Sequence, residues 1–113
     1  MEYDYSHIQI GNDIEALIEA ATLNLSPNRV VVFFEEEFKI ESAKAAIAEA
    51  YISEAQTKYI ILASQSFNTI SQNSLLKLLE EPPKNIELII ITTSKASLLP
   101  TIRSRLPIGV QLS

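Results

Sequence analysis

Two arginines lie near the end of the chain, in the segment Leu98-Leu-Pro-Thr-Ile-Arg-Ser-Arg105. They are separated by one serine and follow a proline. The guanidinium of Arg105 is permanently charged and planar, so it can meet phosphate oxygens with two N–H groups. It can therefore stabilise the charge that develops during phosphoryl transfer. An arginine at this place also suits the end of a short helix, where cations interact favourably with backbone carbonyls. Spacing alone favours this second, structural interpretation.

Other residues that could do chemistry lack the partners that the chemistry needs. Ser64 and Ser66 could act as nucleophiles only beside a base, and the single histidine, His7, is far from them along the chain. His7 itself is better explained as a packed or surface residue. Thr92 and Thr93 end a predicted strand, and their hydroxyls favour capping of the helix that follows.

Composition limits the class of protein. The 113 residues are 47% hydrophobic, carry a net charge of -5 and include no cysteine. This length predicts one domain over residues 1–113 with a single core. We infer no metal and no cofactor. The acidic charge argues against direct nucleic-acid binding, and the apolar runs are far shorter than a membrane span, so we expect a cytoplasmic protein with no membrane contact.

The elements that would position these residues alternate along the chain. Strands are expected at residues 7–10, 29–34, 59–63, 86–92 and 108–112. Helices are expected at residues 14–25, from 40 to about 55, from a cap at Thr69 or Ser71 to 81, and at about 99–105. The acidic residues 35–37 are interpreted as a solvated loop. Such alternation predicts an α/β fold, a three-layer sandwich with a five-stranded parallel sheet between helices.

In a parallel sheet of this kind a ligand lies beyond the carboxyl ends of the strands. The segments expected to meet there are Gly11-Asn12, the loop after Phe34, Ala63-Ser64 and Thr92-Thr93. A nucleotide site would need a glycine-rich loop with lysine after the first strand, and a carboxylate for Mg²⁺ after the third. The chain instead has residues 11–13 (GND) and 63–66 (ASQS), so ATP hydrolysis by this domain alone is not expected.

The residues from Ser71 to Pro83, SQNSLLKLLEEPP, are followed by LIIITTS and LLPTIRSRL. This succession resembles the AAA+ domain, of the P-loop NTPase fold, of bacterial DNA polymerase III clamp-loader subunits, and most closely the delta prime subunits. Those subunits carry NALLKxLEEPP, a strand that ends in threonine, and LLPTIxSRC. Similarity extends over the rest of the chain with a degenerate phosphate loop at residues 11–13. Leu106 stands where the family has cysteine.

The resemblance implies a function in DNA replication. Arg105, within its Ser104-Arg105 motif, would be an arginine finger that acts in trans on ATP held by a neighbouring subunit. The chain would be a non-hydrolysing structural stator, not an enzyme on its own but part of a DNA polymerase holoenzyme, which is a transferase. Its partners would be the delta and gamma/tau subunits, with the sliding clamp and primed DNA reached through the complex.

The resemblance also implies what this chain lacks. The lid and collar domains through which clamp-loader subunits assemble are absent from it, so we expect a monomer when it is isolated. Whether Thr92 or Thr93 retains the family's phosphate-sensing role stays open.

Two other functions also stay open. The chain could be an ATP-binding fragment of a clamp-loader ATPase, which would require the backbone amides of residues 11–13 to hold phosphate without a lysine. It could instead be an α/β protein-interaction adaptor with no nucleotide role, in which the arginine motif is kept for its packing.

Overall fold

A five-stranded parallel sheet forms the centre of the computed structural model, which describes residues 5–110. Its strands are β1 (His7–Ile10), β2 (Arg29–Phe34), β4 (Lys58–Ala63), β6 (Ile86–Thr92) and β7 (Ile108–Val110), and they lie in the order β2-β4-β6-β1-β7. Every neighbouring pair is parallel. Residues 111 and 112 of the predicted last strand lie outside the described residues.

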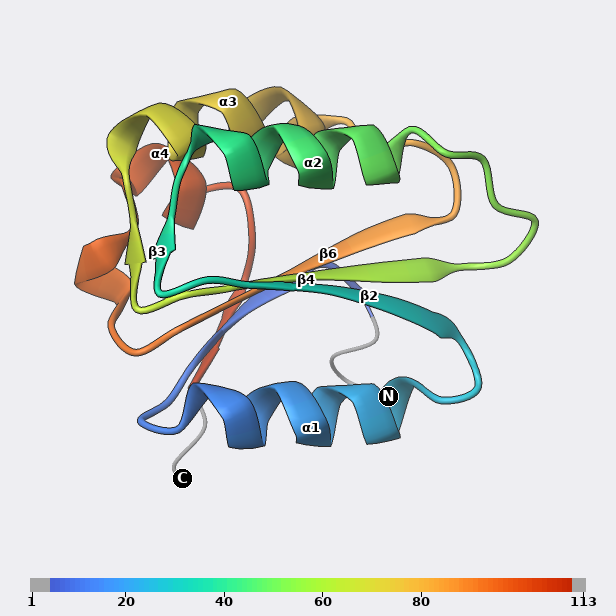
Figure 1. Cartoon of the computed structure of the whole chain (residues 1–113), viewed down its shortest axis with the longest axis horizontal. Coiled ribbons are helices and arrows are strands. Elements are labelled where there is room, and N and C mark those ends of the chain that lie inside the picture. Colours follow the sequence, from blue (N-terminus) through green and yellow to red (C-terminus); the bar gives the residue numbers. More distant parts are fainter. Residues whose placement is uncertain (1–4, 111–113) are drawn as a thin grey trace.

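Helices cover both faces of this sheet (Figure 1). On one face lies α1 (Ile14–Leu25), and on the other lie α2 (Ile40–Ala50), α3 (Thr69–Glu80) and the short α4 (Pro100–Arg103). The predicted three-layer α/β sandwich is therefore confirmed. Among the described residues, no helix has the length and apolar character needed to cross a lipid bilayer.

A second, two-stranded parallel sheet was not predicted. It pairs β3 (Glu37–Phe38) with β5 (Ser66–Phe67), and the rings of Phe38 and Phe67 stack with their centroids 4.9 Å apart. The prediction of a solvated loop at residues 35–37 was wrong for Glu37, which belongs to β3. Strands of two residues are too short to show any periodicity in a sequence.

Helix boundaries also differ from the expectation. The α2 helix ends at Ala50, not near residue 55. The cap of α3 is Asn68, whose side chain accepts the Ser71 N–H at 2.8 Å, and neither of the expected capping residues. Ser71 is fully buried, and its hydroxyl donates to the Phe38 carbonyl instead. The last helix is one turn shorter than expected and follows a 3-10 turn, η1 (Lys95–Ser97).

The two central strands supply most of the core. All six residues of β4 are buried, and so is every residue of β6 except the partly buried Glu87. Side chains that point to one face of the sheet pack against α2, α3 and α4, and those on the other face pack against α1. Burial on both faces explains why these strands read as continuous apolar runs.

Lys58, the first residue of β4, places a charged group in this core. Its side chain is fully buried, and its Nζ lies 2.9 Å from a carboxylate oxygen of Glu49 and 3.4 Å from one of Glu54. The same ammonium donates to the backbone carbonyls of Glu49 and Ile52. This cluster ties the C-terminal end of α2 to the sheet, and it compensates for the cost of burying a charge.

Removing both carboxylates of this cluster should destabilise the fold strongly. The double variant Glu49→Gln and Glu54→Gln leaves the Lys58 ammonium buried without a counter-charge, which costs about 3 kcal/mol. Urea unfolding followed by circular dichroism measures the loss. The matched control replaces the exposed Glu19 and Glu41 by glutamine, and it should change stability by less than about 0.5 kcal/mol. Equal effects of the two double variants would contradict this account.

His7 is another buried polar residue, at the start of β1. Its Nδ1 donates to the Tyr5 carbonyl at 2.6 Å, and its Nε2 lies 2.9 Å from the amide nitrogen of Gln9. Burial lowers the pKa of His7 below its usual 6.5, and the hydrogen bond to the Tyr5 carbonyl opposes this shift only in part.

The lowered pKa predicts a pH-dependent stability. Because the folded pKa lies below the unfolded one, the stabilisation is complete above pH 6.5 and is lost as the pH falls toward the folded pKa. The unfolding free energy of the wild-type chain should therefore fall more steeply between about pH 7.5 and 5.5 than that of His7→Gln. Parallel slopes for the two proteins in urea titrations would show that His7 does not take up a proton on unfolding.

Candidate functional site

The carboxyl ends of the strands meet at one edge of the sheet, as the sequence predicts. The Gly11 N–H donates to the Thr92 carbonyl at 3.2 Å, and the Ser64 N–H donates to the Ile91 carbonyl at 3.1 Å. These hydrogen bonds extend the pairing of the strands by one residue. The loop after β1 is thereby fixed beside the end of β6.

A cavity of about 580 Å³ opens at this edge, between the start of α1 and the end of β2. The residues that line it are Asn12, Asp13, Ile14, Glu15, Phe34, Glu35, Glu36 and Gln65. Four of these eight side chains are carboxylates, and no lysine or arginine is among the eight. The cavity lies where a nucleotide would bind in a sheet of this kind, but its charge opposes that of phosphate.

Asp13 caps the helix end that would face a phosphate. Its Oδ1 accepts the Ala16 N–H at 3.1 Å, at the N-terminus of α1. A helix N-terminus binds phosphate through free N–H groups and the positive end of its dipole. In this chain a carboxylate from the same chain already interacts with that end.

The hydroxyl groups at the edge have structural partners. Ser64 is buried, and its hydroxyl lies 3.1 Å from the Glu36 carbonyl and 2.8 Å from the Ser66 carbonyl. Thr92 is also buried, and its hydroxyl lies 2.9 Å from that of Ser97. The next element, η1, is capped by Ser94 and not by Thr92 or Thr93. These contacts give Ser64 and Thr92 structural roles.

Arg105 lies elsewhere, on the segment that joins α4 to β7. It follows the last residue of α4 by two positions, and its side chain is 39% exposed. One guanidinium nitrogen lies 3.2 Å from a carboxylate oxygen of Glu80, at the end of α3. Another lies 3.4 Å from the hydroxyl of the exposed Ser104. Neither Arg105 nor Ser104 lines the acidic cavity.

Buried side chains on both sides hold this segment in place. Ile102 and Leu106 belong to the core cluster beneath α2 and α3 and are 1% and 7% exposed. Leu106 takes the place where the resembling family has cysteine, and an apolar side chain can fill that buried position as a cysteine would. With the neighbours on either side anchored inward, the arginine between them is directed outward.

Gln72 is a positioning residue that the sequence analysis did not single out. It is 3% exposed, and its amide nitrogen donates to the carbonyls of Phe67 and Ser97 at 2.9 and 3.1 Å. Its amide oxygen accepts the Leu99 N–H at 2.6 Å, immediately before α4. One side chain thus joins α3, β5 and the start of the arginine-bearing segment. Its spacing three residues before Leu75, on the buried stripe of α3, could have revealed it.

Arg103 is oriented differently from Arg105. It is partly buried, and its Nε is buried without a hydrogen-bond partner among the described residues.

Comparison with protein families gives one match over most of the chain. The family described as "DNA polymerase III, delta subunit" matches residues 12–111. Among curated proteins, DNA polymerase III subunit gamma/tau of Mycobacterium tuberculosis is 39% identical over 59 residues, which cover 50% of this chain and 10% of that protein. Subunit gamma of Buchnera aphidicola is 31% identical over 70 residues, covering 59% of this chain and 19% of that protein.

A solved structure supports the same assignment. The DNA polymerase III gamma subunit-related protein from Thermotoga maritima superposes with a TM-score of 0.80 at 26% identity. The match covers 95% of this chain and 40% of that one. The fold is therefore AAA+-like. The chain spans only between a tenth and two fifths of the length of these relatives.

The contacts of Gln72 predict that it controls the segment before Arg105. Gln72→Leu leaves the Leu99 N–H and the carbonyls of Phe67 and Ser97 without their partner, and it should cost about 1 to 3 kcal/mol of unfolding free energy. Amide hydrogen exchange in α4 should accelerate more than exchange in β4. The control Gln56→Leu makes the same change at an exposed position and should leave both measurements unaltered. Unchanged exchange in α4 of the Gln72 variant would contradict this positioning role.

Proposed function

This chain belongs to the DNA polymerase III delta subunit family, and from that premise we propose that it works as a clamp-loader subunit in DNA replication. More narrowly, the proposal is a delta prime-like subunit that does not hydrolyse ATP. It would act as a structural stator and would supply Arg105 to the ATP site of a neighbouring subunit. That residues 1–113 make up one domain of this subunit is part of the same proposal.

The observation that carries the proposal is the placement of Arg105. The guanidinium is exposed on an anchored segment, and within residues 5–110 it forms an ion pair with the exposed carboxylate of Glu80 alone. Exposed ion pairs contribute little stability, so the arginine can exchange Glu80 for a phosphate at small cost. It lies outside the chain's own cavity, and so its phosphate partner would have to come from another subunit.

The acidic cavity supports the non-hydrolysing role. Four carboxylates, among them Asp13 at the N-terminus of α1, replace the backbone cradle and the lysine that a triphosphate needs. The proposal accordingly includes no ATPase activity and no bound cofactor for this domain alone.

A second candidate is an ATP-binding gamma-like subunit. It is favoured by the curated relatives, which are named as gamma or gamma/tau subunits. The chemistry of residues 11–13 weighs against it, because Asp13 would lie against the phosphates. The remaining alternative, an adaptor with no nucleotide role, makes no use of an exposed Arg105.

The partners belong to the same proposal. They would be the delta and gamma/tau subunits, and the sliding clamp and primed DNA would be reached through the complex. The net charge of -5 supports an indirect role in DNA binding.

Substitution of Arg105 tests this function. In a clamp loader reconstituted with the full-length subunit, Arg105→Ala should lower ATP turnover at the neighbouring site by at least about tenfold. Arginine fingers contribute roughly 10³ or more in rate, and the loss of the guanidinium leaves the transition-state charge unmatched. Arg105→Lys should restore only part of the rate, because an ammonium cannot form the bidentate contact.

Two controls separate the finger from the alternatives. Arg29→Ala removes the same charge from an exposed residue at the amino end of β2 and should leave turnover unchanged, as should Glu80→Gln, which only frees Arg105. Normal ATP turnover by an assembled Arg105→Ala complex would contradict the arginine finger and favour the adaptor with no nucleotide role. Tight ATP binding by the isolated chain would favour the gamma-like subunit.

A further inference from the structure

The β2 strand forms one edge of the main sheet, and within residues 5–110 it pairs with β4 alone. The Glu35 N–H, just after β2, donates to the Ala63 carbonyl of β4. Because the backbone groups of a strand alternate in direction with a period of two, residues 29, 31 and 33 also face β4. The backbone N–H and C=O groups of Val30, Val32 and Phe34 therefore face outward, where an added strand could pair with them.

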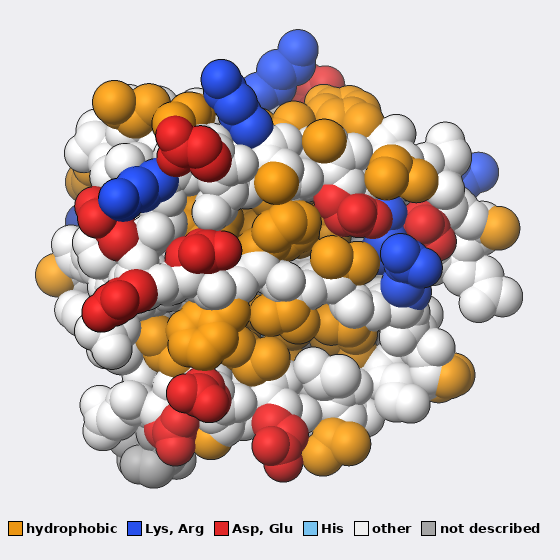
Figure 2. Space-filling view, in the orientation of Figure 1, with side chains coloured by type: hydrophobic (Ala, Val, Ile, Leu, Met, Phe, Trp, Pro, Cys, Tyr) orange, Lys and Arg blue, Asp and Glu red, His pale blue; other side chains and the backbone are white. Residues whose placement is uncertain are grey.

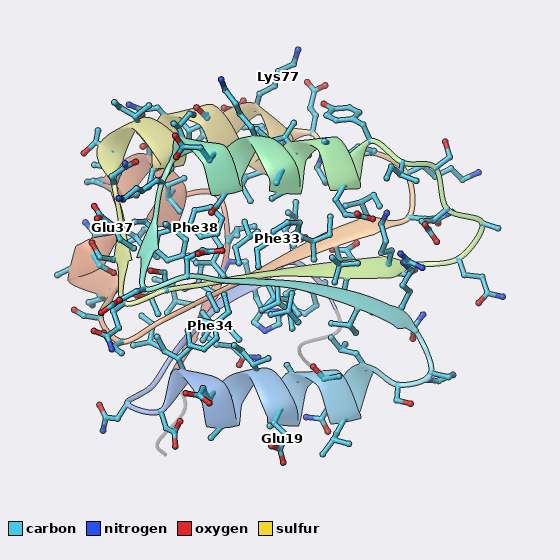
Figure 3. All side chains as sticks on the ribbon, in the orientation of Figure 1. Glu19, Phe33, Phe34, Glu37, Phe38 and Lys77 are labelled. Carbon is cyan, nitrogen blue, oxygen red and sulfur yellow. The ribbon has the colours of Figure 1, made fainter. Side chains whose placement is uncertain are left out.

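This edge also exposes apolar side chains. Val32 is 39% exposed and Phe34 is 44% exposed, although both lie in a strand of six residues with no charge after Arg29. Phe33 lies on the α2 side of β2 and Phe34 on the α1 side (Figure 3). Natural proteins usually protect such an edge with a charge, a proline or a bulge inside the strand. Residues 30 to 34 of β2 include no charged residue and no proline, and their pairing with β4 has no bulge.

Carboxylates lie along this apolar edge, and the exposed Arg29 is at its amino end. Figure 2 shows hydrophobic side chains in bands above and below the sheet edge, with Asp and Glu side chains among them and with Lys and Arg side chains toward the top and right of the view. At the carboxyl end of β2, Phe34 forms one wall of the 580 Å³ cavity, beside Glu35 and Glu36. Asp13 and Glu15 contribute from the start of α1. The apolar edge and the acidic cavity thus form one continuous surface around Phe34.

We propose that the β2 edge binds an extended segment of a partner protein by strand addition. The segment pairs with the outward backbone groups of residues 30, 32 and 34, which supply affinity without regard to sequence. Apolar residues of the segment cover Val32 and Phe34, and they alternate with basic residues. A lysine or arginine of the segment enters the acidic cavity at the end of β2.

Charge selects this occupant over two others. A second copy of the chain would bring the same carboxylates to the interface and another net charge of -5, so pairing of two β2 edges is disfavoured. A nucleic acid would be repelled by the same groups. A basic and apolar segment instead matches both features of the surface.

The proposed surface does not depend on the function of Arg105. The β2 strand is the first in the order β2-β4-β6-β1-β7, and Arg105 lies on the segment that leads into β7, the last strand in that order. The two surfaces could be occupied at the same time, and each can be tested while the other is left intact.

Two short synthetic peptides test the proposal on the full chain. In one, valine alternates with arginine, and in the other valine alternates with glutamate. Fluorescence anisotropy should show binding of the arginine peptide only, and amide exchange of Val32 and Phe34 should slow when it is bound. Val32→Pro removes an outward N–H without breaking a bond to β4, and it should weaken binding by at least about tenfold.

The acidic contribution is tested by a matched pair of double variants. Replacement of Glu35 and Glu36 by glutamine should weaken binding of the arginine peptide at least about fivefold, whereas the same change at the adjacent, exposed Glu80 and Glu81 should not. If Val32→Pro unfolds the chain, Val32→Lys places a charge on the same edge and should weaken binding equally.

Three results would overturn the proposal. Equal binding of the two peptides would remove the charge selectivity, and binding of neither would mean that the carboxylates merely protect an edge strand from association. Concentration-dependent dimerisation of the chain in sedimentation, abolished by Val32→Pro, would show that the occupant is a second copy.

Discussion

The structure depends on the burial of two strands from both sides. In β4 and β6 nearly every side chain is buried, and a strand of that kind is stable only if helices cover both faces of its sheet. The three layers follow from this requirement, as do the crossover helices that parallel pairing needs. They also bring the carboxyl ends of β1, β2, β4 and β6 to one edge. Both the acidic cavity and the loops around it result from that arrangement.

Polar side chains then fix the ends of the elements, where apolar packing is not directional. Lys58 fastens the loop after α2 at the amino end of β4. Ser64, Ser71 and Gln72 do the same near the carboxyl ends through hydrogen bonds to backbone carbonyls. Buried groups of this kind must be satisfied, so each of them selects one loop conformation over others of similar hydrophobic burial. The geometry of the arginine-bearing segment is thus set partly by an amide on α3.

The distribution of charge gives the chain two distinct surfaces. Carboxylates line the edge where a nucleotide would be held in an ATP-binding relative of this fold, and the exposed guanidinium of Arg105 lies outside that cavity. A domain that repels phosphate at its own site while it presents an arginine elsewhere is suited to complete another subunit's site. The open β2 edge would add the proposed surface for protein contact, at the opposite end of the strand order from the strand that follows Arg105. Both roles require partners, and neither requires turnover by the chain itself.

The sequence by itself determined the order of the elements, the parallel sheet and the segments that meet at its edge. The apolar runs and helical stripes encode these features directly, because burial of one face or two imposes its own period. It also singled out Arg105 through a motif. Only the tertiary structure decided that β3 pairs with β5, that Asn68 caps α3, and that Gln72 holds the Leu99 N–H. Those contacts join residues distant in sequence or compete with equally suitable neighbours, so no local pattern specifies them. The position of β2 at the sheet edge was likewise decided by the strand order. Its apolar run resembles those of the central strands β4 and β6, so the sequence pattern does not reveal that position.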